Sequence, residues 1–224
     1  MNHTTKAAEV EKQPIAQIDL DEINRFTLRE LSAEEVFTFR LAACDNQVDR
    51  DDERFSDATL SQLAQLYPGK PVLLDHDWSA KEQSARVYGA QVREDPVRAG
   101  VKQLILRCFV PRLETTKGFI EAIETGLKRE CSVGCAVKHR KCSICGEEYY
   151  ESCLHIRGQE YNGMTCHVVL DGAEDAYEVS MVAVPAQKEA GVIKSGDEKP
   201  REDWKKSARA MIALEKDRFG ALRP

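Results

Sequence analysis

The sequence predicts an α+β fold in which strands outnumber helices. Three observations support this prediction. Apolar runs of strand length recur between residues 36 and 184, two segments have the spacing of amphipathic helices, and a stretch rich in cysteine and histidine interrupts the strand pattern at residues 138–170. We therefore expect the strands to form the core and the cysteine-rich stretch to be a small insertion.

The first predicted strand covers residues 36–41, where Phe37, Phe39 and Leu41 alternate with other residues as on a half-buried strand. Pro185 ends the last strand, because proline cannot donate a ladder hydrogen bond. The other predicted strands are residues 72–74, 85–92, 104–110, 130–137 and 178–184.

Two helices are predicted between these strands. Ser56 can cap a helix that places Leu60, Leu63 and Tyr67 on one face, and Pro68 stops it. The second helix opens at Thr115 or Thr116 and carries Phe119, Ile120, Ile123 and Leu127, with Gly126 near its end, where a left-handed cap suits glycine.

The chain divides into three predicted regions. Residues 1–33 are polar, mixed in charge and weakly periodic, which predicts a flexible or helical N-terminal arm. Residues 34–194 hold the strand and helix patterns and form the predicted core domain. Residues 195–224 begin with a linker and continue as an amphipathic pattern that predicts a tail helix.

Composition excludes several classes of protein. The 224 residues carry a formal net charge of -6, which disfavours binding to duplex nucleic acid. No stretch approaches the roughly 20 apolar residues of a membrane span, and the first residues lack the apolar core of a signal peptide. Without export, the eight cysteines are interpreted as thiols or metal ligands rather than a disulfide framework.

A structural zinc site is predicted in the insertion. The set chosen is Cys142, Cys145, Cys153 and His155, because these residues are compact in sequence and a Cys-x-x-Cys turn lets two thiolates reach one ion. Cys166 is an alternative to His155, and His139 and His167 are weaker claimants. Buried or redox-active thiols are the competing interpretation of these cysteines.

Three residues on separate segments are candidates for hydrolytic chemistry: His76, Ser132 and Glu178. A serine, a histidine and a carboxylate are the parts of an acyl-transfer charge network. In the strand 130–137, alternation places Ser132 and Gly134 on one face and the neighbouring cysteines on the other, which we expect to be buried. Each residue alone has an ordinary structural explanation, and no Gly-x-Ser-x-Gly elbow is present.

The order of these segments resembles the phage prohead proteases, capsid-maturation serine proteases related to the herpesvirus assemblins. The resemblance covers residues 36 to 194. The segments that carry it are Leu41-Ala42-Ala43-Cys44-Asp45 with the acidic loop that follows, the His76 segment, Cys131-Ser132-Val133-Gly134, and Glu178-Val179-Ser180-Met181-Val182-Ala183-Val184-Pro185-Ala186.

The resemblance implies a mainly antiparallel, β-barrel-like protease domain with flanking helices. It implies Ser132 as nucleophile and His76 as general base, with Glu178 chosen as the orienting carboxylate. Asp171 and Asp175 are alternatives for this third role, and His167 would match the viral pattern.

The resemblance also implies substrates and a setting. The expected activity is a serine endopeptidase that cleaves scaffold and capsid-protein segments, and its own tails, inside the assembling procapsid in the host cytoplasm. The expected partners are the phage major capsid protein and scaffold, with self-association as a further option and neither nucleic acid nor membrane. The alternative is a non-catalytic, zinc-containing assembly protein that binds scaffold.

Overall fold

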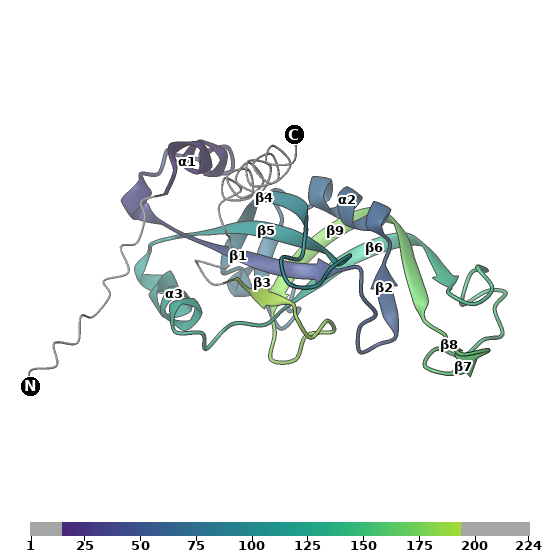
Figure 1. Ribbon diagram of the computed structural model, residues 1–224. Coiled ribbons are helices and arrows are strands. Elements are labelled where there is room, and N and C mark those ends of the chain that lie inside the picture. Colours follow the sequence, from purple (N-terminus) through teal and green to yellow (C-terminus); the bar gives the residue numbers. More distant parts are fainter. Residues whose placement is uncertain (1–14, 194–224) are drawn as a thin grey trace, which may run out of the picture. The chain divides into compact units, whose positions relative to one another are not determined.

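The computed structural model describes residues 15–193 and has an α+β fold with one large sheet and few helices (Figure 1). The α-helices are α1 (Gln17–Asn24), α2 (Asp57–Leu66) and α3 (Lys117–Glu124), and the 3₁₀ turns are η1 (Ala33–Glu35), η2 (Ala80–Glu82) and η3 (Glu114–Thr116). The strands are β1 (Val36–Asp45), β2 (Glu53–Phe55), β3 (Pro71–Leu74), β4 (Ala85–Glu94), β5 (Lys102–Pro111), β6 (Cys131–Cys142), β7 (Glu160–Tyr161), β8 (Met164–Thr165), β9 (Val168–Met181) and β10 (Gly191–Val192).

The main sheet has the strand order β10-β1-β5-β4-β3-β9-β2, with β6 also paired to β9. Most pairs are antiparallel, and only β2 and β3 run parallel to β9. The ladders among the described strands do not close into a barrel. An isolated bridge joins Glu130, just before β6, to Gly191 of β10.

The predicted strands are present, but the last one ends at Met181 rather than just before Pro185, so the predicted stop was three residues too late. Two strands also extend much further than expected at their other ends. β6 continues to Cys142 and β9 already begins at Val168, so the ends of the predicted insertion at 138–170 belong to a long two-stranded ribbon. The short β7–β8 hairpin lies beyond the end of this ribbon (Figure 1). The strand-length patterns missed this extension because its residues are polar or half-buried, as on a ribbon exposed on both faces.

Both predicted core helices are present. Ser56 caps α2, since its hydroxyl accepts a hydrogen bond from the Thr59 N–H at 3.1 Å. Tyr67, directly after α2, is fully buried, and its hydroxyl donates to the carbonyls of Gly134 and Glu178 at 3.3 and 3.2 Å. The helix therefore ties together the two strands that carry candidate catalytic residues.

The second helix begins where it was predicted, and Gly126 lies near its end as expected, but the helix stops at Glu124, before Leu127. The helical segment follows Thr116, and Gly126 after it takes the left-handed conformation at φ +77°. Leu127, which the pattern assigned to the buried face, is 81% exposed because it lies beyond this turn.

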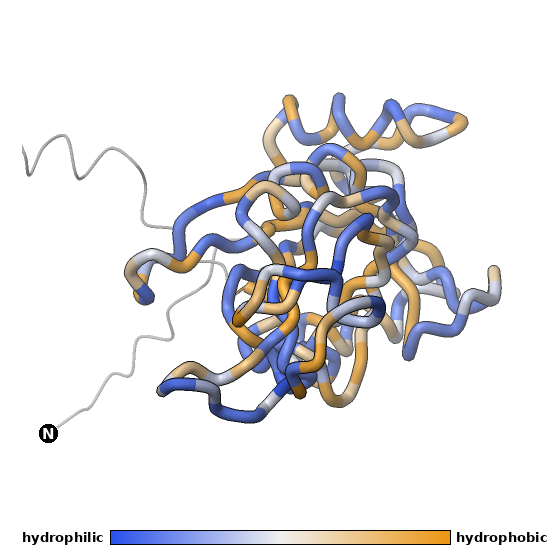
Figure 2. Tube along the Cα trace, turned by 90° about the vertical axis from the view of Figure 1, so that its right-hand side faces the viewer, coloured by the Kyte–Doolittle hydropathy of each residue, from blue (hydrophilic) through white to orange (hydrophobic). Residues whose placement is uncertain are grey.

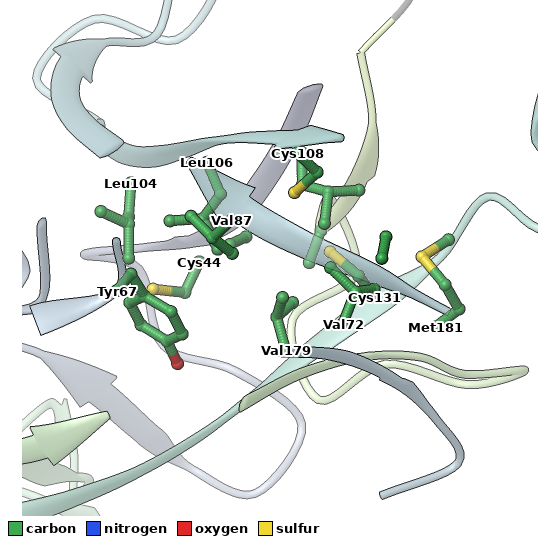
Figure 3. Packing of buried hydrophobic residues seen from close by; sticks show 14 of the residues in the cluster. Cys44, Tyr67, Val72, Val87, Leu104, Leu106, Cys108, Cys131, Val179 and Met181 are labelled. Carbon is green, nitrogen blue, oxygen red and sulfur yellow. The ribbon is translucent and has the colours of Figure 1, made fainter. Parts of the chain in front are cut away.

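Hydrophobic and hydrophilic segments alternate along the chain trace (Figure 2). The main core lies between the sheet and α2, and its side chains come from strands distant in sequence (Figure 3). Cys44, Cys108 and Cys131 are buried among these residues. The strand alternation predicted for β6 is thus correct, since the Cys131 face points into the core.

Part of the predicted N-terminal arm is a docked helix. The apolar side chains of α1, Leu20 and Ile23, pack in a small cluster with Tyr88 and Phe109 of the sheet. Arg107 of β5 forms ion pairs with two carboxylates of α1, at 2.7 Å to Asp19 and 2.6 Å to Glu22. The rest of the arm before residue 15 and the predicted tail helix lie outside the described residues.

Candidate active site and metal centre

Two polar side chains of β9, Glu178 and Ser180, lie on one face of the strand and are buried. Directly paired strand residues share a face, so Ser132 and Gly134 of β6, which pair with Ser180 and Glu178, lie on this face too. On the other side of β9, Ser180 is paired with Leu73 of β3. The polar face thus spans the neighbouring strands β6 and β9, next to the C-terminal end of β3.

His76 is held over this face by an unusual turn. Asp75 and His76 follow β3 and both have left-handed backbones, with φ values of +51° and +56°. Non-glycine residues pay of order 1–3 kcal/mol for such conformations and keep them only where contacts enforce them. Here the Asp75 N–H donates to the Met181 carbonyl and the His76 N–H donates to the Ser180 hydroxyl, both at 3.0 Å.

The imidazole of His76 is oriented by Glu178. Its Nδ1 lies 2.8 Å from Oε1 of Glu178, and the hydroxyl of Ser180 donates to Oε2 at 2.5 Å. The carboxylate is 2% exposed, whereas the imidazole is 41% exposed. Holding Nδ1 in this way directs the other ring nitrogen, Nε2, away from the carboxylate, which is how a general base is presented to a nucleophile.

Gly134 makes room for this carboxylate. A Cβ atom built at Gly134 would overlap Oε1 of Glu178. The Glu178 side chain therefore lies directly over the β6 backbone, and only glycine allows so close an approach. The Ser-x-Gly spacing in the sequence has this steric role besides any role in a catalytic motif.

Ser132 is half-buried on the same face, two residues before Gly134. Within residues 15–193, its hydroxyl has no hydrogen bond, and it is not bonded to His76. The structure thus joins two of the three predicted residues and places the third on the adjacent strand. Ser180 was missed by the sequence reasoning, although the Glu-x-Ser alternation in the last strand signals a shared face.

The alternatives for the third catalytic position are engaged elsewhere. Asp171 accepts from Ser56 at 2.7 Å and Lys141 at 3.0 Å, and these contacts lower its carboxyl pKa. Asp175 has its pKa lowered by Lys70, 3.1 Å away. His167 Nε2 accepts from Arg54 at 3.2 Å. Among these candidates, only Glu178 contacts His76.

A second cluster of reactive side chains forms beyond the end of the β6–β9 ribbon. The ligand atoms of Cys142, Cys145, Cys153 and His155 all lie within 4.8 Å of one another, which is the set predicted for zinc. The Cys145 and Cys153 sulfurs are 3.7 Å apart, and the Cys153 sulfur is 3.6 Å from Nδ1 of His155. A tetrahedron with Zn–S bonds of about 2.3 Å has edges of about 3.8 Å, so these spacings suit one ion.

Backbone N–H groups point at two sulfurs of the cluster, those of Cys142 and Cys153, and such contacts favour the thiolate form. The N–H of Ile144 points at the Cys142 sulfur at 3.4 Å, and the N–H of His155 points at the Cys153 sulfur at 3.2 Å. Burial alone would raise the pKa of Cys142, but N–H groups of Cys145 and Ile144 lower it to about 6. Burial, together with the neighbouring thiols, raises the pKa of Cys153 to about 11.

Cys166 borders the same cluster. Its sulfur is 3.7 Å from that of Cys142, and burial raises its pKa to about 11. Cys166 therefore remains an alternative to His155. His139 is bonded to Glu148 at 2.6 Å, which separates it from the cluster. The donor set of thiols and imidazole, with N–H groups aimed at sulfur, fits a structural zinc ion.

Comparison of the chain with protein-family models, with curated proteins and with solved structures finds no match. Within the described residues, no helix has the length and apolar character needed to span a membrane.

Proposed function

We propose that this chain is a serine endopeptidase in which Ser132 is the nucleophile, His76 the general base and Glu178 the carboxylate that orients the base. The observation that carries the proposal is the 2.8 Å contact between His76 Nδ1 and Glu178 Oε1. It is supported by the strained turn at His76 and by the position of Ser132 on the same polar face.

In this mechanism, Nε2 of His76 removes the Ser132 proton as Oγ attacks a peptide carbonyl. Glu178 stabilises the imidazolium that forms and keeps Nδ1 protonated. His76 then gives the proton to the leaving amine, and water attacks the acyl-enzyme by the reverse path. The Ser132 hydroxyl must approach Nε2 when substrate binds, as catalytic hydrogen bonds commonly tighten in the bound complex. Backbone N–H groups near Ser132 or from a neighbouring loop would stabilise the oxyanion.

We further propose a role in phage prohead maturation, with scaffold and capsid-protein segments and the chain's own tails as substrates inside the procapsid. The support is the resemblance of residues 36 to 194 to prohead proteases. A barrel-like core is part of the same proposal. The bridge between Glu130 and Gly191 supports it, because it links the edge of β6 to the opposite end of the sheet through β10.

For the metal cluster we propose zinc, held by Cys142, Cys145, Cys153 and either His155 or Cys166. A bound ion would supply structural cross-linking rather than catalysis, since four protein ligands complete a tetrahedral shell. It would fix the tip of the β6–β9 ribbon.

The function is tested by co-expressing the chain with a candidate capsid protein and its scaffold, and measuring intact masses. Wild type is expected to shorten one or both partners, and Ser132→Ala and His76→Ala are expected to leave them full length. Ser61→Ala, an exposed hydroxyl on α2, is the matched control and should process normally.

A non-catalytic, scaffold-binding role is the second candidate, favoured by the lack of a hydrogen bond between Ser132 and His76 in the described structure. It predicts that processing does not change in either variant, and that removal of residues 200–224 reduces incorporation into proheads. Processing that continues in Ser132→Ala would overturn the protease proposal.

A further inference from the structure

A pocket of about 290 Å³ opens beside Ser132. Apolar side chains, among them Phe55 of β2 and Val133 of β6, form part of its lining. The residues that follow β1 contribute Asp49 and Asp51. The pocket therefore combines an apolar wall with an acidic loop, next to the proposed nucleophile.

Among residues 15–193, the edge of β6 that faces away from β9 has no strand partner between Val133 and Lys138, and Val133 lines the pocket. The carbonyl of Glu130, just before β6, points toward β9 and accepts from the Val182 N–H. The N–H of the next residue, Cys131, points away from β9 and donates to the Ala190 carbonyl. Antiparallel ladders alternate in this manner, so the N–H and C=O of Val133 also point away from β9. An extended polypeptide could pair with Val133 at this edge, which would place its side chains at the pocket.

The charge of the lining is negative. Three carboxylates, those of Asp49, Asp51 and Glu53, line the pocket with one guanidinium, that of Arg140. Glu53 also has an ion pair with Arg157 at 3.0 Å. Asp51 has no ion pair among residues 15–193.

Burial disfavours the charged form of two of these carboxylates, those of Asp49 and Glu53. Burial raises the pKa of Asp49 even though its carboxylate accepts backbone N–H groups from Glu53 and Asp51. Burial also raises the pKa of Glu53. A cation entering the pocket would offset this desolvation, because an opposite charge nearby favours the ionised carboxylate.

We infer that the pocket binds a lysine or arginine side chain of the substrate polypeptide, within a few residues of the scissile bond. The aliphatic stem would lie along Val133 and Phe55, and the cationic head would reach Asp51. Long basic side chains combine an apolar stem and a charged tip in this way. The inference rests on the proposed protease function and adds a substrate preference to it.

The test uses the purified full chain and a peptide mixture prepared from a bacterial lysate by cleavage after acidic residues, so that lysine and arginine are retained. New peptide ends are sequenced by mass spectrometry, with Ser132→Ala as the blank. A synthetic peptide based on the preferred site is then compared with its lysine-to-glutamine counterpart in wild type, in Asp51→Asn and in Asp51→Lys. Glu121→Gln, an exposed carboxylate on α3, is the matched control.

We expect lysine or arginine to be enriched at one position near the cleaved bond. The kcat/KM ratio of the lysine peptide to the glutamine peptide should fall by about tenfold or more in Asp51→Asn. It should fall further in Asp51→Lys and stay unchanged in Glu121→Gln. Ser132-dependent cleavage without basic enrichment, or enrichment that does not change in both Asp51 variants, would overturn the inference and leave the protease function standing. Absence of any Ser132-dependent cleavage would overturn the protease function, and the inference with it.

Discussion

Glu178 and His76 are 102 positions apart in the chain, yet their side chains meet at 2.8 Å on the buried side of a strained turn. The contact exists because β3 runs parallel to the end of β9, so the residues that follow β3 fold back over the Glu178 side chain. The carboxylate is buried and bonded on both oxygens, which fixes the imidazole and its tautomer. In the proposed mechanism, this pair is therefore already in place for proton transfer before substrate binds.

Replacing Glu178 with glutamine tests this preparation. Glu178→Gln keeps the shape of the side chain but removes the charge that stabilises the imidazolium, so kcat should fall by about 10²- to 10⁴-fold with little change in KM. Asp171→Asn, on the same strand but paired with Lys141, is the control and should retain activity. Equal activity in Glu178→Gln and wild type would remove Glu178 from the mechanism.

Gly134→Ala should disturb the same pair through sterics alone. The added methyl overlaps the Glu178 carboxylate, so we expect a loss of about 1–3 kcal/mol in the free energy of unfolding together with reduced activity. Gly118→Ala on α3 is the matched control, because nothing lies within 4 Å of its Cβ position and alanine favours helices. The free energy of unfolding of both variants is measured by denaturant titration and compared with that of wild type. Equal stability of Gly134→Ala and wild type would contradict the proposed steric overlap with Glu178.

Zinc binding should depend on pH and on named thiols. Binding requires the Cys153 thiolate, whose pKa is raised to about 11 in the ion-free site, so a proton is released near neutral pH and affinity should increase by roughly tenfold per pH unit for each such thiol. Competition with a chelator at several pH values measures this slope. An affinity that does not change with pH would argue against thiolate ligands.

Metal content per chain identifies the ligands. Cys142→Ser and Cys153→Ser should lose the ion, and Cys135→Ala, a thiol outside the cluster, should keep about one per chain. Comparing His155→Ala with Cys166→Ala then shows which residue is the fourth ligand. Wild-type protein without zinc and with every cluster thiol free to react would refute the site.

The thiols of Cys131 and Cys135, on the face of β6 opposite Ser132, should resist alkylation. Burial raises the pKa of Cys131 to about 12 and that of Cys135 to about 11, so at pH 8 only about one in a thousand or fewer of these groups is a thiolate. Iodoacetamide labelling followed by mass spectrometry should show slow modification of both that accelerates as pH rises. The exposed Cys145 of zinc-free protein is the internal comparison. Cys135 lines the pocket beside Ser132, so rapid labelling of Cys135 at pH 8 would contradict its raised pKa.

Much of the fold was predictable from local patterns. The alternation of Phe37, Phe39 and Leu41, the Ser56 cap and the left-handed Gly126 are effects of a few adjacent residues on backbone conformation, and each is present in the structure. Sequence spacing also found the metal set, because its first three ligands lie within twelve residues and need only tight turns to meet.

The tertiary structure decided everything that depends on strand pairing. From the sequence, Glu178 could not be separated from Asp171 and Asp175, since all three lie near the last strand. The parallel pairing of β3 with β9 brings His76 to Glu178, while Asp171 and Asp175 lie further along β9 and form ion pairs with Lys141 and Lys70. Local residue patterns determine strands and turns because they act through adjacent backbone. Partners more than a hundred positions apart are determined by register, which only the packed sheet establishes.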